Sequence, residues 1–333
     1  ALEWGLVDEL APPTEFNDAV GRRAAVLAAT STRLDGEPAS LSPLRISVEQ
    51  DSINYTSVSL KLADTHAELT VSVERTSDWL LQTARELDDA LCRLRFDFPE
   101  IGSLILRTEG LTEDAAALDQ ELRLSEDNLQ LETALLWRRC LSRLDLMSKT
   151  LVAAIEPGSC FVGVLLELAL AADRTFMLEG RFEEQMVPLA PASIRVTESN
   201  LGRLPMWNGL SRLASRLWGD EDSLGRISEA LNRDLMASQA SSFGLATTTP
   251  DDLDWDDELR LFIEERSSFS ADALTAMEAN QRFCGPETMA TKIFARLSAW
   301  QNWVFTRPNA SGPEGSLQRY GTGSRPKFDN RRT

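Results

Sequence analysis

The chain has 333 residues, of which 43% are hydrophobic and 26% are charged, and its formal net charge at pH 7 is −18. This length and composition are ordinary for a globular protein with one large or two ordinary domains. The negative charge argues against nucleic-acid binding and against adhesion to anionic membranes, since both need clustered lysine and arginine.

Histidine and cysteine usage narrows the possible chemistry. The single histidine, His66, lies in a polar stretch and is expected to be a solvated turn residue rather than a base. Its isolation removes His-based triads and His-rich sites, and we expect no metal centre. The four widely spaced cysteines predict reduced thiols in a cytoplasmic protein. No apolar run approaches the roughly 20 residues of a membrane span, and no signal peptide is expected.

A short motif at the start of the chain recurs downstream. Residues 1–7 and residues 240–246 both read alanine, two residues, an aromatic, then Gly-Leu and a small apolar residue. An amphipathic helix is predicted after each copy, at 16–29 and at 255–269. Such a repeat indicates two modules of one kind.

The repeat suggests a division of the chain. We expect residues 1–30 to be the tail end of a truncated first unit whose front lies outside this sequence. Residues 31–50 are expected to be a linker, 51–265 a second unit, and 266–333 a helical region with a tail that is ordered only if it docks on a partner surface. The linker contains several turn formers: Gly36, Pro38 and Pro43.

Alternation predicts how the second unit begins. Residues 55–62 and 68–73 alternate apolar and polar side chains, which indicates a β-hairpin. Asp78 can cap a helix in which leucines recur up to Leu94. A short buried strand is expected at 101–108.

A long amphipathic helix predicted at 125–147 leads to the stretch that organises the unit. Residues 151–155 predict a buried strand, which Pro157 and Gly158 end. Residues 162–172, rich in alanine and leucine, predict a buried helix. A further strand is expected at 175–178.

The turn before that helix allows two interpretations. Backbone N–H groups at a helix start lack partners, so those near Gly163 and Val164 could hold a carbonyl oxygen that gains negative charge. Glu167 lies about one turn further in, where burial would favour the neutral acid. Alternatively, the glycines only allow close packing and Glu167 bonds a neighbouring backbone. Cys160 is the one thiol in this turn.

The stretches Glu156–Phe161 and Glu167–Asp173 resemble the crotonase (enoyl-CoA hydratase/isomerase) superfamily, in which a helix follows a glycine-rich oxyanion turn. Residues 277–289 and 299–310 support a resemblance to a branch of it, lyases that act on epoxidised benzoyl-CoA. The resemblance covers nearly the whole chain. It implies an α/β fold, a crotonase-like (ClpP/crotonase) spiral of ββα units with a helical C-terminal region. In that superfamily a "Gly-Leu-Val-Asp" strand, matched by residues 5–8, closes the catalytic core.

The resemblance also implies the site. Residues 196–206 match a superfamily segment that places Glu198 on the second catalytic carboxylate and Glu167 on the first. Two carboxylates in different environments can divide acid and base roles. Gly163, Val164 and Cys160 would bind the substrate, a CoA thioester. Neither cofactor nor metal is implied.

Two departures weaken the second unit as a catalyst. Catalytic members have a small-residue turn where residues 108–114 are acidic, and three glycines where this chain has Gly163 followed by Val164 and Leu165. Bulky side chains narrow the approach of a thioester. We therefore expect the second unit to be structural.

The intact protein is expected, by resemblance, to be a cofactor-free lyase that opens the ring of epoxidised benzoyl-CoA with water and releases formate and a semialdehyde CoA thioester. This chain would be its auxiliary half. The alternative is an enoyl-CoA hydratase or isomerase acting through Glu167 and Glu198. Expected partners are an acyl-CoA substrate, the missing N-terminal crotonase unit and copies of itself in a homo-oligomer.

Overall fold

The computed structural model describes residues 1–32, 39–124, 127–183 and 189–332. The chain divides into two compact units, Ala1–Ser40 and Leu41–Thr333. The division falls inside the stretch 31–50 that the sequence predicts as a linker, of which Gly36 and Pro38 lie outside the described residues.

The first unit contains a tight turn and one helix, α1 (Phe16–Ala28). Gly5 has a left-handed backbone (φ 66°). Its N–H donates to the carbonyl of Leu2, and the N–H of Leu6 donates to that of Ala1, both at 3.0 Å. The described residues 1–32 contain no strand, so the expected core-closing strand at residues 5–8 is wrong for this segment. Local carbonyls take the N–H groups that a strand would offer to a neighbour.

A seven-stranded sheet, counted over the described residues, forms the centre of the second unit, in the order β1-β2-β3-β4-β5-β6-β8. Strands β1 to β4 pair antiparallel, and β4, β5, β6 and β8 pair parallel. The predicted hairpin is confirmed as β3 and β4, and the strand expected at 101–108 as β5. The strand bounds are β1 Ser47–Val48, β2 Ser52–Asn54, β3 Val58–Leu62, β4 His66–Ser72, β5 Ser103–Glu109, β6 Thr150–Ile155 and β8 Arg174–Met177.

Burial in this sheet follows the sequence pattern. In β4, Ala67, Leu69 and Val71 are buried and alternate with half-exposed neighbours, because successive side chains point to opposite faces. Every residue of β6 is buried, as expected for a central parallel strand covered on both faces. A smaller sheet has the order β10-β9-β7, in which β9 (Ser193–Arg195) pairs parallel with β7 (Phe161–Val162) and antiparallel with β10 (Asp234–Met236).

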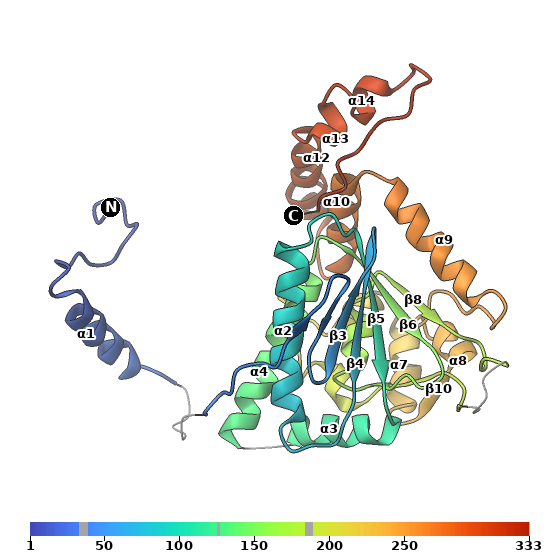
Figure 1. Cartoon of the computed structure of the whole chain (residues 1–333), viewed down its shortest axis with the longest axis horizontal. Helices are drawn as coiled ribbons and strands as arrows, with labels where there is room; N and C mark the ends of the chain where they lie inside the picture. Colours follow the sequence, from blue (N-terminus) through green and yellow to red (C-terminus); the bar gives the residue numbers. More distant parts are fainter. Residues whose placement is uncertain (33–38, 125–126, 184–188, 333) are drawn as a thin grey trace. The chain divides into compact units, whose positions relative to one another are not determined.

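Helices cover the large sheet on both sides. Figure 1 shows α2 and α4 along one side of the sheet and α9 on the other. The rings of Trp79 in α2 and Trp137 in α4 stack with centroids 6.3 Å apart. The helix bounds up to α9 are α2 Trp79–Phe96, α3 Thr112–Leu124, α4 Asn128–Asp145, α5 Leu166–Leu170, the 3₁₀ helix η1 Glu198–Leu201, α6 Arg212–Arg216, α7 Glu221–Glu229, α8 Ala237–Ser242 and α9 Trp255–Ser268.

Some helix ends differ from the prediction. The helix expected at 162–172 is only α5, because Phe161 and Val162 pair with β9 and Gly163 has a left-handed backbone (φ 51°). Asp78 stands at the start of α2 without a side-chain capping bond. Asp127 caps α4 by accepting from the N–H of Gln130, while Ser125, the expected start, lies outside the described residues.

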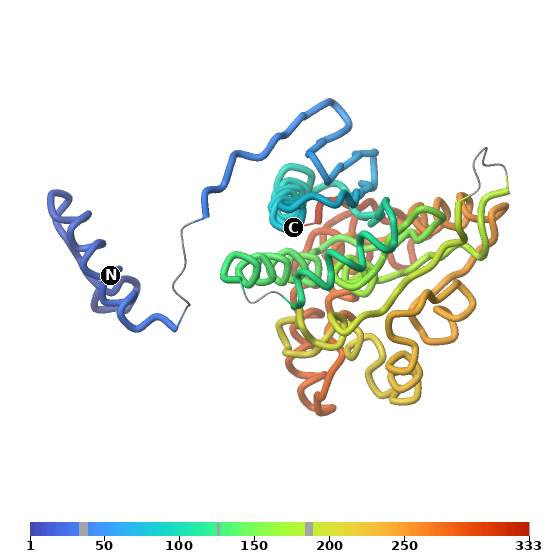
Figure 2. Tube along the Cα trace, turned by 90° about the horizontal axis from the view of Figure 1, so that it is seen from below, coloured from blue at the N-terminus to red at the C-terminus, as the bar shows by residue number. Residues whose placement is uncertain are grey.

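The C-terminal region is helical and its end packs on the same chain. The N–H of Arg332 donates to the carbonyl of Pro99, and Figures 1 and 2 both place the end of the chain beside α2. No helix in the described ranges is both long and apolar enough to cross a membrane. The remaining helices are α10 Ala271–Arg282, α11 Met289–Thr291, the π-helix η2 Lys292–Leu297, α12 Ser298–Phe305, α13 Pro308–Ser311 and α14 Ser316–Arg319.

Candidate functional site

The turn with the predicted oxyanion donors is closed by a side chain of the protein itself. The backbone N–H of Val164 donates a hydrogen bond of 2.8 Å to Oδ1 of Asp119, a buried residue of α3. The other carboxylate oxygen, Oδ2, accepts from the hydroxyl of Thr197, also at 2.8 Å. Asp119 therefore occupies the direction along which the Val164 N–H would meet a substrate oxygen.

Gly163 is fitted to this arrangement. Its positive φ favours glycine, and a Cβ at this position would collide with the carboxylate of Asp119. The Gly163 carbonyl accepts from the side-chain amide of Asn200 at 2.9 Å. The glycine thus permits the close approach of α3, and its N–H donates to the carbonyl of Arg195 in β9 at 3.3 Å.

Glu167 is buried, as predicted, and lies in an ion-pair network rather than on a free surface. Its Oε1 accepts from Asn200 Nδ2 at 2.7 Å and its Oε2 accepts from Arg212 Nη1 at 2.9 Å. Arg212 also donates twice to Asp145, at 2.9 and 2.6 Å. The partners of Glu167 are side chains. They are therefore not the neighbouring backbone that the packing interpretation expected, and Glu167 is not the unpaired neutral acid of the oxyanion interpretation.

The contact of Asp119 with Val164 and the ion pair of Glu167 with Arg212 belong to one continuous hydrogen-bond network. The N–H of Thr197 donates to Asn200 Oδ1 at 3.0 Å, which connects the Glu167 end to the Asp119 end. Its members are all buried. In order they are Asp145, Arg212, Glu167, Asn200, Thr197, Asp119 and the N–H of Val164.

Burial dominates the electrostatics of this network. It raises the pKa of Glu167, of Asp145 and of Asp119, against the opposing effect of their hydrogen-bond donors. Burial also works to lower the pKa of Arg212, but Glu167 and Asp145 outweigh it and hold that pKa above its usual range. A proton carrier for catalysis needs an oxygen that faces the substrate, and both oxygens of Glu167 accept from the protein.

Glu198 has a different environment. Its side chain is 42% exposed, accepts from Asn232 at 3.0 Å and lies 3.5 Å from a guanidinium nitrogen of Arg123. Its own backbone N–H, and then Asn232, lower the pKa of the carboxyl. It lines a polar cavity of about 220 Å³ together with Asp119 and Arg195. Glu167 is not among the residues that line this cavity, so the structure does not bring the two carboxylates to one cavity.

Cys160 is also withdrawn from the surface. Its side chain is fully buried, and burial raises the pKa of the thiol to about 11. Its backbone N–H donates to the hydroxyl of Thr108 at 2.9 Å. The thiol is therefore protonated at neutral pH, and the substrate-binding role of this residue stays a prediction.

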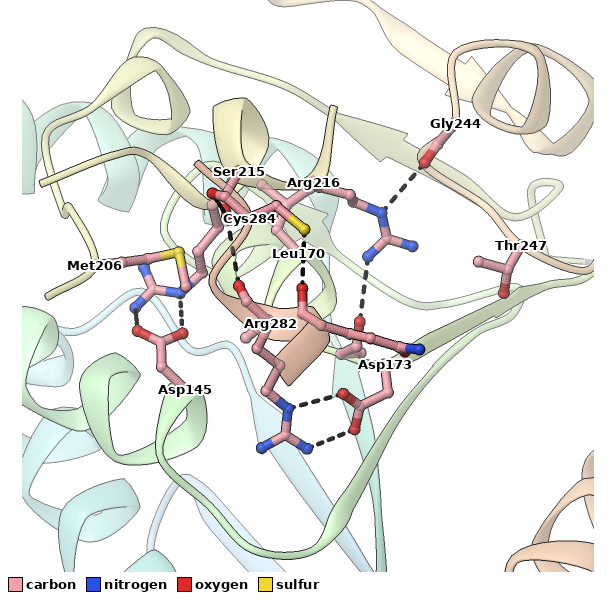
Figure 3. Close-up of a pocket in the computed structure, with 14 residues that line it drawn as sticks. Asp145, Leu170, Asp173, Met206, Ser215, Arg216, Gly244, Thr247, Arg282 and Cys284 are labelled. Atoms are coloured by element: carbon pink, nitrogen blue, oxygen red, sulfur yellow. Dashed lines mark hydrogen bonds and ion pairs between the residues drawn. The ribbon is translucent and has the colours of Figure 1, made fainter. Parts of the chain in front are cut away.

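A larger cavity of about 330 Å³ lies at the other end of α5. Figure 3 shows two of its arginines directed at partners within the protein: Arg282 binds Asp173 with two hydrogen bonds, and Arg216 reaches the carbonyl of Gly244. Residues 171–173, which follow α5, line it, whereas Gly163 and Val164 precede α5 and do not. The cavity is thus separate from the predicted oxyanion turn.

Sequence reasoning missed Asp119, Arg212 and Asp145. A signal for Asp119 exists, because the buried face of α3 consists of Ala115, Leu118 and Leu122 with this single carboxylate among them. A charge on an apolar face predicts a buried partner. The described residues contain no group of three or more His, Cys, Asp or Glu side chains that could hold a metal ion.

No protein-family model matches the chain. A curated relative, the benzoyl-CoA-dihydrodiol lyase of Aromatoleum evansii, is 40% identical in an alignment that is 347 residues long, gaps included. The alignment covers 99% of this chain and 61% of the lyase. This chain has a crotonase fold and is similar in sequence to that lyase. Its fold agrees: it matches an enoyl-CoA hydratase of Geobacillus kaustophilus with a TM-score of 0.61 and 18% identity, over 86% of this chain and 100% of that one.

A second solved structure, an enoyl-CoA hydratase of Bacillus anthracis, matches with a TM-score of 0.60 and 16% identity, over 83% of this chain and all of that one. The crotonase fold predicted from the sequence is thereby confirmed. At such identities these two structures show the fold alone. The chain spans about 61% of the length of its lyase relative.

Proposed function

We propose that this chain is the auxiliary, non-catalytic half of a cytoplasmic, cofactor-free lyase that opens the ring of epoxidised benzoyl-CoA. In the proposed reaction water opens the ring, and formate and a semialdehyde CoA thioester leave. The identity to benzoyl-CoA-dihydrodiol lyase over 99% of the chain supports the reaction class and the acyl-CoA substrate. A crotonase unit outside this sequence would carry the catalytic groups, and the whole protein would form a homo-oligomer.

One contact carries the auxiliary role, the hydrogen bond from the Val164 N–H to Asp119. Crotonase-type chemistry on a thioester needs donors aimed at an oxygen that becomes negative. Here the donor already binds a buried carboxylate, which would also repel such an oxygen. The helix that follows has only five residues, so its dipole adds little.

The assay is turnover of epoxidised benzoyl-CoA by this chain, with the intact Aromatoleum evansii lyase as reference. We expect the chain by itself to show less than about 1% of the reference rate, because losing an oxyanion donor typically costs about 100-fold to 1,000-fold. Turnover comparable to the reference would contradict the proposal.

A second candidate is an enoyl-CoA hydratase or isomerase that uses Glu167 and Glu198. It is favoured by the exposure of Glu198 in a cavity that also holds Arg123 and Arg195. This function predicts crotonyl-CoA hydration that falls at least about 100-fold in both Glu167→Gln and Glu198→Gln. An unmeasurable activity in the unmodified chain would eliminate it.

A further inference from the structure

The two copies of the repeated motif have the same local structure. Gly5 and Gly244 are both left-handed, with φ of 66° and 74°. Each glycine N–H donates to the carbonyl three residues earlier, and each following leucine N–H to the carbonyl of the alanine that opens the motif. In both copies the helix begins at the same distance in sequence after the glycine: at Phe16 after Gly5, and at Trp255 after Gly244. Residues 1–28 are called the first copy below, and residues 240–267 the second copy.

Matching positions of the two copies differ in burial. Three apolar side chains of the first copy are half or more exposed, whereas their counterparts in the second copy are buried. The pairs are Leu6 (69% exposed) and Leu245 (2%), Phe16 (57%) and Trp255 (2%), and Val20 (50%) and Leu259 (7%). A contiguous exposed apolar surface marks a binding site, whereas single exposed apolar residues need no explanation.

The second copy shows what this surface is built to contact. Its helix α9 packs on β5 of the large sheet, with Phe262 against Phe176 of β8 at a ring distance of 5.6 Å. Trp255 meets the ring of Phe182 edge-on at 6.4 Å. The segment between motif and helix joins the sheet too, because the N–H of Met177 donates to the carbonyl of Thr248 at 3.0 Å. In the second copy, then, the apolar face lies on one face of a parallel crotonase sheet.

We propose that the exposed apolar side chains of the first copy, Leu6, Val7, Phe16 and Val20, dock on the sheet of another crotonase module. On the large sheet in residues 41–333, the place that corresponds to this docking site is covered by α9. In a second copy of this chain the corresponding place is covered by α9 in the same way. The lyase relative is longer than this chain, which covers 61% of it, and that leaves length for a further module. This inference names the partner of the proposed auxiliary half and rests on the proposed function.

The test uses a chimaera in which this chain replaces the aligned part of the full-length Aromatoleum evansii lyase. Hydrogen exchange followed by mass spectrometry compares α1 in the chimaera with α1 in this chain by itself. We expect the α1 amides to exchange at least about 100-fold more slowly in the chimaera, because docking prevents local opening. Val20→Asp in the chimaera should abolish that protection.

Val26→Asp is the matched control. Val26 lies on the same helix and is 59% exposed, but its counterpart in the second copy, Glu265, faces solvent. We expect this variant to keep the protection. The unmodified Aromatoleum evansii lyase provides a second measurement should the chimaera fold poorly, since its segment aligned with Phe16–Ala28 is expected to be protected.

Three results would overturn the inference: fast exchange of that segment in the unmodified lyase, equal loss of protection in both variants, or protection of α1 in this chain by itself that rises with concentration. The last result would identify a second copy as the partner. Exchange is independent of turnover, so a chain that proves catalytic would refute the proposed function and leave the docking result standing.

Discussion

Oδ1 of Asp119 lies 2.8 Å from the backbone nitrogen of Val164 and accepts its hydrogen bond. The two residues come from different elements, α3 and the turn after β7, so the contact fixes one against the other. The N–H group that could have bound an anion is instead part of a buried contact within the protein. A buried N–H without an acceptor is costly, so the carboxylate has a structural role even where no substrate binds.

Asp119→Ala is expected to lower the free energy of unfolding by about 1–3 kcal/mol. It leaves the Val164 N–H and the Thr197 hydroxyl without their acceptor in a buried place. Asp119→Asn retains one carbonyl oxygen and should cost less. Urea denaturation of the three proteins checks the order, and a fully stable alanine variant would show that the contact carries no stability.

The pH dependence of stability distinguishes the charge of Asp119 from its shape. Burial raises its pKa in the folded state, so the folded protein binds this proton more tightly than the unfolded chain does. Its contribution to the free energy of unfolding therefore falls as pH rises from the unfolded pKa, near 4, through the raised folded pKa. As pH rises through that window, the free energy of unfolding of Asp119→Asn should increase relative to that of the unmodified chain. A difference that is constant with pH would contradict this.

Gly163→Ala should be much more damaging than Gly209→Ala. Both glycines have positive φ, so both variants carry the left-handed penalty of about 1–2 kcal/mol. Only at Gly163 does the new Cβ also meet Asp119, whereas Gly209 faces open space. The double variant Gly163→Ala with Asp119→Ala should recover part of the loss, measured as a coupling energy in a double-mutant cycle. Additive effects would mean that the two residues do not meet.

Arg212→Met is expected to cost about 3–5 kcal/mol, because it leaves Glu167 and Asp145 buried without their shared cation. Glu198→Gln, a change at an exposed carboxylate, should leave the unfolding midpoint essentially unchanged. Thermal and urea unfolding measure both. Equal midpoints for the two variants would contradict the buried network.

The C-terminal end is expected to stabilise the second unit through the contacts of Arg332. Its guanidinium is buried and donates to Glu278 at 3.2 Å and to the carbonyl of Ser148 at 3.1 Å. Arg332→Met should cost about 3 kcal/mol, because Glu278 is buried and loses its nearest cation. Arg331→Met is the neighbouring control, since Arg331 pairs with Asp329 in solvent. A loss of stability that is equal in both variants would show that the end of the chain is not anchored.

Local patterns predicted most of the sheet. The alternation around Leu69 and Val71 and the apolar run 151–155 depend on neighbouring residues alone, and both strands formed where expected. The burial of Glu167 followed from its apolar surroundings in the same way. The helix expected at 162–172 was too long because pairing of Val162 with Arg195 overrides helix propensity.

The closure of the site could not be predicted in the same way. Asp119 meets Val164 across 45 positions, and Arg212 meets Asp145 across 67, so only the folded arrangement of α3, α4 and α6 brings them together. The tail was predicted to need a partner surface for order. Arg332 instead packs within its own chain, because it donates to the buried carboxylate of Glu278, which lies more than fifty positions earlier in the sequence.

The central claim is that the second unit does not hold a thioester at its turn, since Asp119 takes the donor of Val164. Isothermal titration of this chain with benzoyl-CoA tests it most directly. We predict no saturable binding up to about 1 mM, which corresponds to a binding free energy weaker than about −4 kcal/mol. A micromolar Kd that is lost in Gly163→Ala and retained in Gly209→Ala would place the ligand at this turn and contradict the account.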